Sequence, residues 1–452
     1  MKKRASLILF LALLLPLAGW ALGPHEILVL VNTNSVESVH IGGLYARLRH
    51  VPDANVIQVG TSTGSSMSVK GFRETIFDPV QKEARRRGVD SHILAWVYAP
   101  GFPWRIEENP DLSLTGLTFL RGVPPTNLVA KGEWLSPYFA GPNYPGERGY
   151  GSRSLDVLSD WLGDERPLAA WVLAHVGDGG LTPDEAGAML IRGMDSDSTR
   201  PEGVVYYVTN SDVRSQARAW EIPEAVQELK VLGARSEVTH AIPRGVQSVN
   251  GLFIGSASFD PQGIRFTAGA LADHLTSYGA AFSEAGQTKC TVWLSAGAAA
   301  AGGTVTEPFA YWAKFPNARL FVHYAAGCTA LESYYQSLRQ PLQYLPMGDP
   351  LAAPWKPRAE VTVEGLDEAV SGVGQSLRIR VKAGDSTFWS SYRVYVDGRE
   401  AGGGWMGDPY PWKPAGWLPG LHELRVVARS GGLLRHQAFV VRPFTLPARE
   451  AP

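Results

Sequence analysis

Residues that could carry out hydrolytic chemistry gather between Phe266 and Pro354. They accompany apolar runs that are typical of buried strands: Asp273, His274, Thr276, Ser277, Thr304 and Glu307. A histidine near a carboxylate and a hydroxyl can act as a general base toward a nucleophile. Because open α/β sheets collect their ligands at the carboxyl ends of strands, we expect His274, Thr304 and Glu307 to line one concavity.

The same residues also have structural explanations. On a helix, Asp273 and Ser277 would share a face and His274 would point elsewhere, which does not favour a simple catalytic triad. Buried histidines and carboxylates ordinarily form hydrogen bonds to neighbouring loops. Glu307 precedes Pro308 and could stabilise the start of a helix by its negative charge. Two alternatives therefore stay open for these residues: they could act in catalysis or ligand binding, or they could hold neighbouring loops in place.

The sequence predicts neither a metal ion nor another cofactor. No group of histidine, cysteine and acidic residues shows the spacing of metal ligands, and Asp349-Pro350 is typical of a turn. The two cysteines, Cys290 and Cys328, could form a disulfide worth roughly 3 to 4 kcal/mol or remain as buried thiols. Cys328 precedes a predicted helix, where a thiol pKa can fall. It is a candidate nucleophile without an evident histidine partner.

Apolar runs that alternate with helical stripes predict an α/β domain over residues 24–356. The run 26–31 is continuous, as expected for a strand covered on both faces, and Ser35 follows it as a helix N-cap. Thr182 and Glu185 form a capping box at the start of another helix. Further strands are predicted at 55–59, 93–98, 169–174, 204–208, 252–254 and 291–294. This order predicts a mostly parallel sheet flanked by helices.

A segment rich in proline, glycine and aromatic residues, 101–151, interrupts this alternation. It is much longer than an ordinary connection of about 4 to 6 residues, so we expect a long loop. Trp104, Trp134, Tyr138 and Tyr144 indicate that the loop is ordered against a surface. It could cover the predicted concavity, or it could be an insertion that contacts no ligand.

Residues 357–445 have the pattern of a small β-sandwich. Short strand-like runs are separated by turns, and Asp397-Gly398 is a hairpin signal. Trp405, Trp412 and Trp417 lie in a stretch rich in glycine and proline. These side chains could stack on sugar rings or cap the end of the sandwich core.

Residues 1–23 have the layout of a secretory signal peptide. Lys2, Lys3 and Arg4 precede an apolar run that ends at Pro16, and small residues then predict cleavage near Ala21 or Gly23. A membrane anchor would need about 20 unbroken apolar residues, and no later stretch has them. The 42 basic and 43 acidic residues exclude the positive surface expected of a nucleic-acid-binding protein. We therefore expect a secreted or periplasmic protein of the bacterial cell envelope.

Four motifs occur in order along residues 26–354: LVLVNTNSVES, ADHLTSYG, GTVTEPF with a nearby KFP, and GDPLAAP. Together they resemble an uncharacterised family of exported bacterial proteins. More remotely, the layout is similar to that of gingipain-type cysteine peptidases, which have a caspase-like fold followed by an immunoglobulin-like domain. In those peptidases a His-Gly pair follows one core strand and the nucleophilic cysteine ends the next. At the corresponding positions this sequence has GSA at 255–257 and SAG at 295–297.

The resemblance leads to two functional hypotheses. The first is a non-catalytic gingipain-like relative that binds an extracellular or cell-envelope partner, which could be a protein, a peptide or a glycan. The second is a secreted, peptidase-like hydrolase that uses His274, with Asp273 or Cys328 as further catalytic candidates. In either case the residues expected to contact the ligand are His274, Thr276, Ser277, Thr304 and Glu307. The missing dyad favours the first hypothesis, because losing half of a nucleophile-base pair removes most of the rate.

Overall fold

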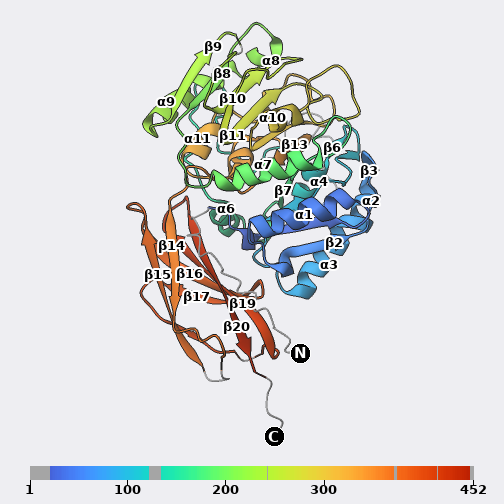
Figure 1. The fold of residues 1–452 in the computed structure, drawn as a ribbon. Helices are drawn as coiled ribbons and strands as arrows, with labels where there is room; N and C mark the ends of the chain where they lie inside the picture. Colours follow the sequence, from blue (N-terminus) through green and yellow to red (C-terminus); the bar gives the residue numbers. More distant parts are fainter. Residues whose placement is uncertain (1–20, 122–133, 242, 371–373, 415, 448–452) are drawn as a thin grey trace, which may run out of the picture.

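The computed structural model describes residues 21–121, 134–241, 243–370, 374–414 and 416–447. Most of the predicted signal peptide lies outside the described residues. The chain forms a large α/β domain followed by a smaller all-β domain, and the two pack side by side (Figure 1). Within the described residues, no helix has the length and hydropathy that crossing a membrane requires.

A ten-stranded mixed sheet organises the α/β domain, in the order β2-β1-β4-β7-β13-β12-β11-β10-β8-β9. Its first half consists of β1 (Ile27–Asn32), β2 (Val56–Val59), β4 (Ala95–Tyr98), β7 (Ala169–Val172) and β13 (Tyr344–Gly348). Its second half consists of β8 (Val204–Val208), β9 (Arg235–Thr239), β10 (Val249–Gly255), β11 (Phe266–Leu275) and β12 (Ala300–Thr304). Strands are parallel within each half, and the halves meet through the antiparallel pair β12 and β13.

Helices cover the sheet, and their starts follow the capping signals of the sequence. Ser35 accepts a hydrogen bond from the Ser38 amide at 3.1 Å, and the predicted capping box of Thr182 and Glu185 is present. In Figure 1, α1 and α7 lie on the face of the sheet toward the viewer. The α-helices are α1 (Val36–Leu48), α2 (Val69–Phe72), α3 (Asp78–Arg87), α4 (Leu114–Leu120), α6 (Leu155–Leu162), α7 (Pro183–Asp195), α8 (Val213–Gln216), α9 (Ile222–Val231), α10 (Thr291–Ser295), α11 (Leu320–Ala325) and α12 (Ala330–Ser337).

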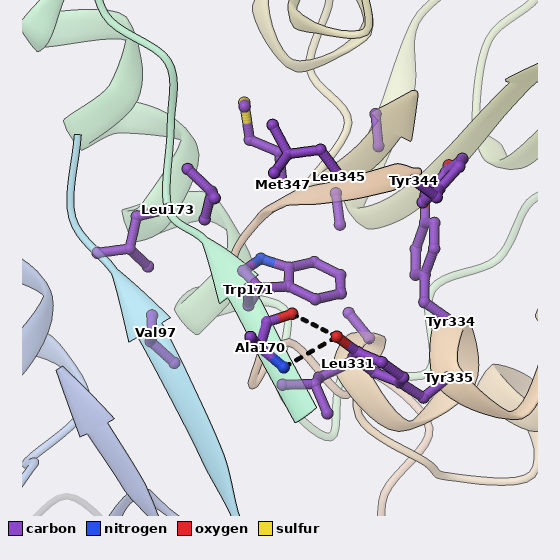
Figure 2. Packing of buried hydrophobic residues seen from close by; sticks show 14 of the residues in the cluster. Val97, Ala170, Trp171, Leu173, Leu331, Tyr334, Tyr335, Tyr344, Leu345 and Met347 are labelled. Atoms are coloured by element: carbon purple, nitrogen blue, oxygen red, sulfur yellow. Dashed lines mark hydrogen bonds between the residues drawn. The ribbon is translucent and has the colours of Figure 1, made fainter. Parts of the chain in front are cut away.

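Aromatic side chains hold β7 to β13 and to helix α12, next to the junction of the two halves (Figure 2). Trp171 of β7 donates a hydrogen bond from Nε1 to the Gly348 carbonyl at 2.9 Å, which ties β7 to β13. Tyr335 of α12 accepts from the Ala170 amide at 2.8 Å and donates to the Ala170 carbonyl at 2.7 Å. Burial of these large rings supplies the hydrophobic stabilisation that the short β7–β13 ladder does not.

The strand predicted at 291–294 is instead helix α10, and the strand of this region is β12. Short apolar runs fit a buried helix as well as a buried strand, which explains the wrong assignment. β12 has the sequence AAGGT, which has little strand propensity. Its glycines are required by close packing, because a side chain at Gly302 would meet the Tyr344 ring and one at Gly303 would meet the backbone of Gly279.

The segment 101–151 contains regular structure as well as loop. Here β5 (Arg105–Glu107) and β6 (Leu112–Ser113) join β3 (Ser66–Ser68) in a small sheet, and α4 follows. Trp104 is buried with its ring edge-on to Phe282 at 5.5 Å, and the Tyr138 hydroxyl donates to the Pro167 carbonyl at 2.7 Å. Trp134 packs against Phe119, whereas Tyr144 is exposed. Most of these aromatic rings therefore pack against the domain.

The all-β domain consists of two antiparallel sheets, as predicted. One contains β14 (Ala359–Glu364), β15 (Gln375–Ala383) and β18 (Tyr410–Trp412). The other contains β16 (Trp389–Val396), β17 (Arg399–Trp405), β19 (Gly420–Ser430) and β20 (Gln437–Leu446). Asp397 and Gly398 form the β16–β17 hairpin turn with positive φ angles of 49° and 78°. The structure confirms the predicted fold class, a mostly parallel sheet with helices followed by antiparallel β-sheets.

Candidate functional site

Asp273 and His274 occupy consecutive positions near the end of strand β11. Side chains of consecutive strand residues point to opposite faces of a sheet, so the two groups are separated by the sheet itself. A hydrogen-bonded Asp-His pair of the kind used in catalytic triads therefore does not form between them. The contacts of each side chain show what it does instead.

Asp273 is a buried partner of Arg218. One carboxylate oxygen accepts a hydrogen bond from the Tyr344 hydroxyl at 2.8 Å, and the other is paired with the Arg218 guanidinium. Arg218 also donates to the carbonyls of Ile254 (3.0 Å) and Pro316 (2.8 Å), and it lies over the Phe253 ring at 3.9 Å. Burial raises the pKa of Asp273, while the positive charge of Arg218 opposes that rise. The carboxylate is thus committed to an internal network.

His274 is fully buried on the other face. Its Nε2 lies 2.7 Å from the Ser256 carbonyl, so Nε2 carries the proton and donates. Its Nδ1 is buried and has no hydrogen-bond partner within the described part of the chain, and the ring packs edge-on to Trp293 at 5.6 Å. Burial lowers the pKa of His274 to about 4, which keeps the ring neutral at pH 7. This environment fixes the loop after β10 to the end of β11.

The loops that follow β11 and β12 are neighbours, as expected for adjacent parallel strands. The Thr304 hydroxyl lies 2.8 Å from the Ser277 carbonyl and 3.3 Å from the Thr276 carbonyl. The Thr276 hydroxyl is bonded in turn to the Ala257 carbonyl (3.2 Å) and to Gln287 (2.5 Å). Glu307 is half-exposed and accepts from the Phe309 amide at 2.8 Å. That His274, Thr304 and Glu307 line one concavity stays a prediction; the cavities described here are lined by other residues.

Cys290 and Cys328 are both free thiols and both buried. Burial raises the pKa of Cys290 to about 12 and raises the pKa of Cys328 as well. The Cys328 sulfur accepts a hydrogen bond from the Gln336 side chain at 3.4 Å and lies 3.8 Å from the Arg153 carbonyl. Helix α12, which follows, is capped by Thr329 and Glu332, so a carboxylate lies where a thiolate would need positive charge.

Asp349, predicted to form a turn, also belongs to a buried ionic network that local patterns do not reveal. It accepts from the Leu351 amide at 3.1 Å, as expected for such a turn, and pairs with Arg49. Arg49 also pairs with Asp197 at 2.5 Å, and Asp197 accepts from Lys356 at 2.8 Å. The four residues of this network are far apart in the sequence. Their charged residue types alone do not show which of them pair. The network fixes the chain where it leaves the α/β domain.

A second polar region lies on the sandwich, and only its tryptophan was singled out in the sequence. A cavity of about 470 Å³, here called the sandwich groove, is lined by Asp160, Ser390, Ser391, Tyr392, Arg393, Gly403, Gly404, Trp405, Arg429, Ser430, Gly431, Gly432 and Arg435. Trp405 is 69% exposed, and exposed apolar residues adjoin the groove in the sequence at Trp161, Phe388 and Leu433. Trp412, in contrast, is buried in the sandwich core, and Trp417 is half-buried beside His422.

The charged groups of the sandwich groove are paired but remain partly accessible. Arg393 pairs with Glu400 at 2.5 Å, and their side chains are half-exposed. Arg435 bridges Asp156 and Asp160, each at 3.0 Å. The groove therefore combines guanidinium groups and the Asp160 carboxylate with an exposed aromatic ring. Such a combination of a few oriented polar groups and an aromatic surface is typical of ligand sites.

Comparison with known proteins identifies no family. No family model matches the sequence, and no curated protein matches it. Among solved structures, fibronectin(III)-like modules of Clostridium thermocellum CbhA are 15% identical over 25% of this chain, with a TM-score of 0.18; the match spans 58% of that chain. The Clostridium perfringens spore cortex lytic enzyme SleM is 8% identical over 79% of this chain and 92% of that chain, with a TM-score of 0.19. These likenesses are too distant to carry a functional argument.

Proposed function

We propose that this protein is an exported, non-catalytic relative of gingipain-like peptidases that binds a glycan of the bacterial cell envelope through the sandwich groove. The observation that carries the proposal is the contrast between His274, which is buried and bonded to the Ser256 carbonyl at 2.7 Å, and Trp405, which is 69% exposed beside polar groups. The residues with catalytic potential serve the fold, whereas accessible binding groups lie on the sandwich.

The environment of each candidate residue supports the non-catalytic part of the proposal. A general base must lie within about 2.6 to 3.2 Å of the proton that it takes. His274 has its one hydrogen bond within the described residues to a backbone carbonyl, which supplies no proton. Cys290 and Cys328 are buried and their thiol pKa values are raised, so neither is a ready nucleophile at neutral pH.

The glycan is inferred from the chemistry of the groove. Indole rings offer a broad apolar face to the C–H groups of a sugar, and a partly wet surface suits an amphipathic ring. The serine hydroxyls at 390 and 391, the guanidinium groups of Arg393 and Arg435 and the carboxylate of Asp160 can exchange hydrogen bonds with sugar hydroxyls. The paired glycines at 403–404 and 431–432 carry no side chains that would obstruct an extended chain.

The proposal is tested on an array of envelope oligosaccharides that includes peptidoglycan fragments. We expect binding by the wild-type protein and at least a tenfold weaker affinity for Trp405→Ala. Tyr144→Ala is the matched control, because Tyr144 is a comparably exposed aromatic residue on the α/β domain. Equal binding by wild type and Trp405→Ala would show that the sandwich groove is not the glycan-binding site.

A parallel assay tests whether the protein is catalytic. Wild type and His274→Gln are incubated with pooled peptide, ester and glycoside substrates, and product release is measured. We expect no turnover above buffer with either protein. Turnover by the wild type that disappears in His274→Gln would support the hydrolase hypothesis and contradict the proposed function.

A further inference from the structure

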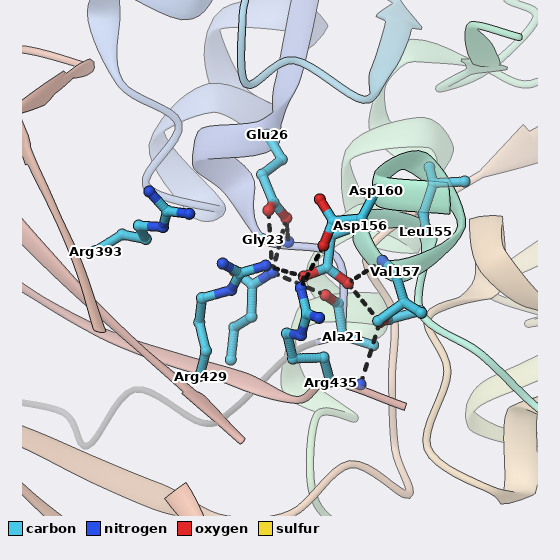
Figure 3. Close-up of polar contacts among 12 residues, drawn as sticks. Ala21, Gly23, Glu26, Leu155, Asp156, Val157, Asp160, Arg393, Arg429 and Arg435 are labelled. Carbon is cyan, nitrogen blue, oxygen red and sulfur yellow. Dashed lines mark hydrogen bonds and ion pairs between the residues drawn. The ribbon is translucent and has the colours of Figure 1, made fainter. Parts of the chain in front are cut away.

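The first described residues are packed inside the boundary between the two domains. Ala21 and Leu22 are completely buried. The Ala21 carbonyl accepts a hydrogen bond at 3.1 Å from Gln437, which is on β20 of the sandwich. The Gly23 amide donates to the Glu26 carboxylate at 2.9 Å, and Figure 3 shows these groups converging with Asp156 of helix α6. The N-terminal segment thus contacts both domains.

The charges at this boundary are not balanced. Glu26 is 6% exposed, and its direct side-chain partners are neutral Gln437, at 3.0 Å, and His25, at 3.8 Å. Arg429 and Arg435 are paired with Asp156, which leaves Glu26 without a guanidinium of its own among the described residues. Burial and the charge of Asp156 raise the pKa of Glu26 to about 8, although the positive charge of Arg429 opposes that rise. A positive charge at this position would stabilise the ionised carboxylate.

A second group at the same place lacks a donor. The side-chain oxygen Oε1 of Gln437 is buried and accepts no hydrogen bond from the described residues. It lies 3.0 Å from the position that a Cβ atom on Gly23 would occupy, so it faces the N-terminal segment. A buried acceptor without a donor is costly, by the free energy of its lost hydration. The site therefore offers one anionic acceptor and one neutral acceptor.

We propose that cleavage of the leader after Ala21 creates an α-ammonium group on Leu22 that binds Glu26 and Gln437 Oε1 and locks the two domains together. This inference rests on the export proposed above. Hydrolysis of the Ala21–Leu22 peptide bond adds one water, leaving a carboxylate on the released leader and the ammonium on the mature chain. The new nitrogen lies within about 7 Å of the Glu26 carboxylate, because adjacent backbone nitrogens are under about 4 Å apart and the Gly23 nitrogen is 2.9 Å from it.

The test compares two otherwise identical chains. One begins at Leu22, released from a fusion partner, and the other carries Ser-Gly before Ala21, which keeps the Ala21 carbonyl but moves the charge away. We expect the melting temperature of the Leu22 chain to be about 1 to 2 °C higher at pH 7. The same pair with Glu26→Gln should show a smaller difference, because Gln437 Oε1 remains as an acceptor but the anionic partner is gone. Equal melting temperatures at pH 7, or a difference that is undiminished in Glu26→Gln, would overturn the proposal.

The pH dependence provides an independent readout. An acid with a raised folded pKa binds its proton more tightly in the folded state, so stability falls as pH rises between about 4.5 and 8. The ammonium should reduce this fall, and the two chains should differ less at pH 5 than at pH 7. The other ionisable groups facing Glu26 are common to both chains: His25, His92, Asp156, Tyr395, Arg429 and Arg435. A difference as large at pH 5 as at pH 7 would contradict a role for Glu26.

Mass spectrometry of the exported protein separates this inference from the proposed function. A mature N-terminus at Leu22 shows that cells make the ammonium. A different N-terminus would overturn its formation in the cell, yet it would leave glycan binding by the groove unaffected. Conversely, a groove that binds no glycan would leave the comparison of the two chains unchanged.

Discussion

The edge formed by β11 and β12 and the sandwich groove contain similar chemical groups in opposite environments. At the edge, Asp273 and His274 are buried and bonded within the protein. In the groove, Arg393 and Trp405 remain accessible to solvent. Residue type alone suggested function at the edge, whereas accessibility favours the groove. The comparison teaches that a polar group can act on a ligand only if it remains accessible to that ligand, whatever its residue type.

The largest expected effect is on the buried edge. Asp273→Ala should destabilise the protein by about 3 to 5 kcal/mol, because Arg218 would remain buried without its carboxylate. Urea unfolding measures the change. Glu307→Ala, at a half-exposed position of the same region, is the control and should cost less than about 1 kcal/mol. Similar losses of stability in both variants would show that the buried pair of Asp273 and Arg218 is no more important to the fold than the half-exposed loop at Glu307.

The next effect is a dependence of stability on pH. Burial lowers the folded pKa of His274 to about 4 from 6.5, so the unfolded chain binds the proton more readily between these values. Stability contributed by neutral His274 is therefore present above about pH 6.5 and is lost as pH falls toward 4. This difference between the folded and unfolded pKa of His274 corresponds to about 3 kcal/mol in the free energy of unfolding.

Unfolding measured from pH 4 to 7 tests this contribution. His274→Gln keeps a side-chain donor but cannot titrate, so its stability should fall less steeply with acid than that of the wild type. The remaining buried histidines, such as His92 and His436, are the same in both proteins. Parallel curves for the two proteins would show that His274 is not held neutral by burial.

The smallest expected effect on stability lies in the groove. Trp405→Ala should change the free energy of unfolding by less than about 0.5 kcal/mol, because the side chain is 69% exposed. Trp412→Ala provides the matched contrast, since Trp412 is buried against Phe444 with ring centroids 4.9 Å apart. We expect that variant to lose about 3 to 5 kcal/mol. A large loss in Trp405→Ala would assign Trp405 to the core and remove it from the groove.

Much of the fold follows from local patterns, because hydrophobic periodicity and caps are local properties. The strand at 26–31, the capping box at Thr182 and the hairpin at Asp397-Gly398 were predicted and are present. Strand β13 was not predicted, because Pro346 in its centre is unusual for an internal strand. It is accommodated opposite Gly302, where packing of Tyr344 over the glycine compensates for poor strand propensity.

The candidate site was less predictable, because its properties depend on tertiary partners. The sequence places Asp273 beside His274 but does not reveal that a strand sends them to opposite faces. Arg218, the partner of Asp273, is distant in the chain and carries no local signal. The sandwich groove likewise combines Asp160 of α6 with Trp405 of β17, two elements that only the fold brings together.

The most direct test of the account is calorimetric titration of an envelope oligosaccharide, selected by the array, into Trp405→Ala and His274→Gln. The account predicts at least tenfold weaker binding for Trp405→Ala and unchanged affinity for His274→Gln, provided that circular dichroism shows both variants folded. The opposite pattern, with affinity lost in His274→Gln and retained in Trp405→Ala, would move the site to the β11–β12 edge and contradict the account.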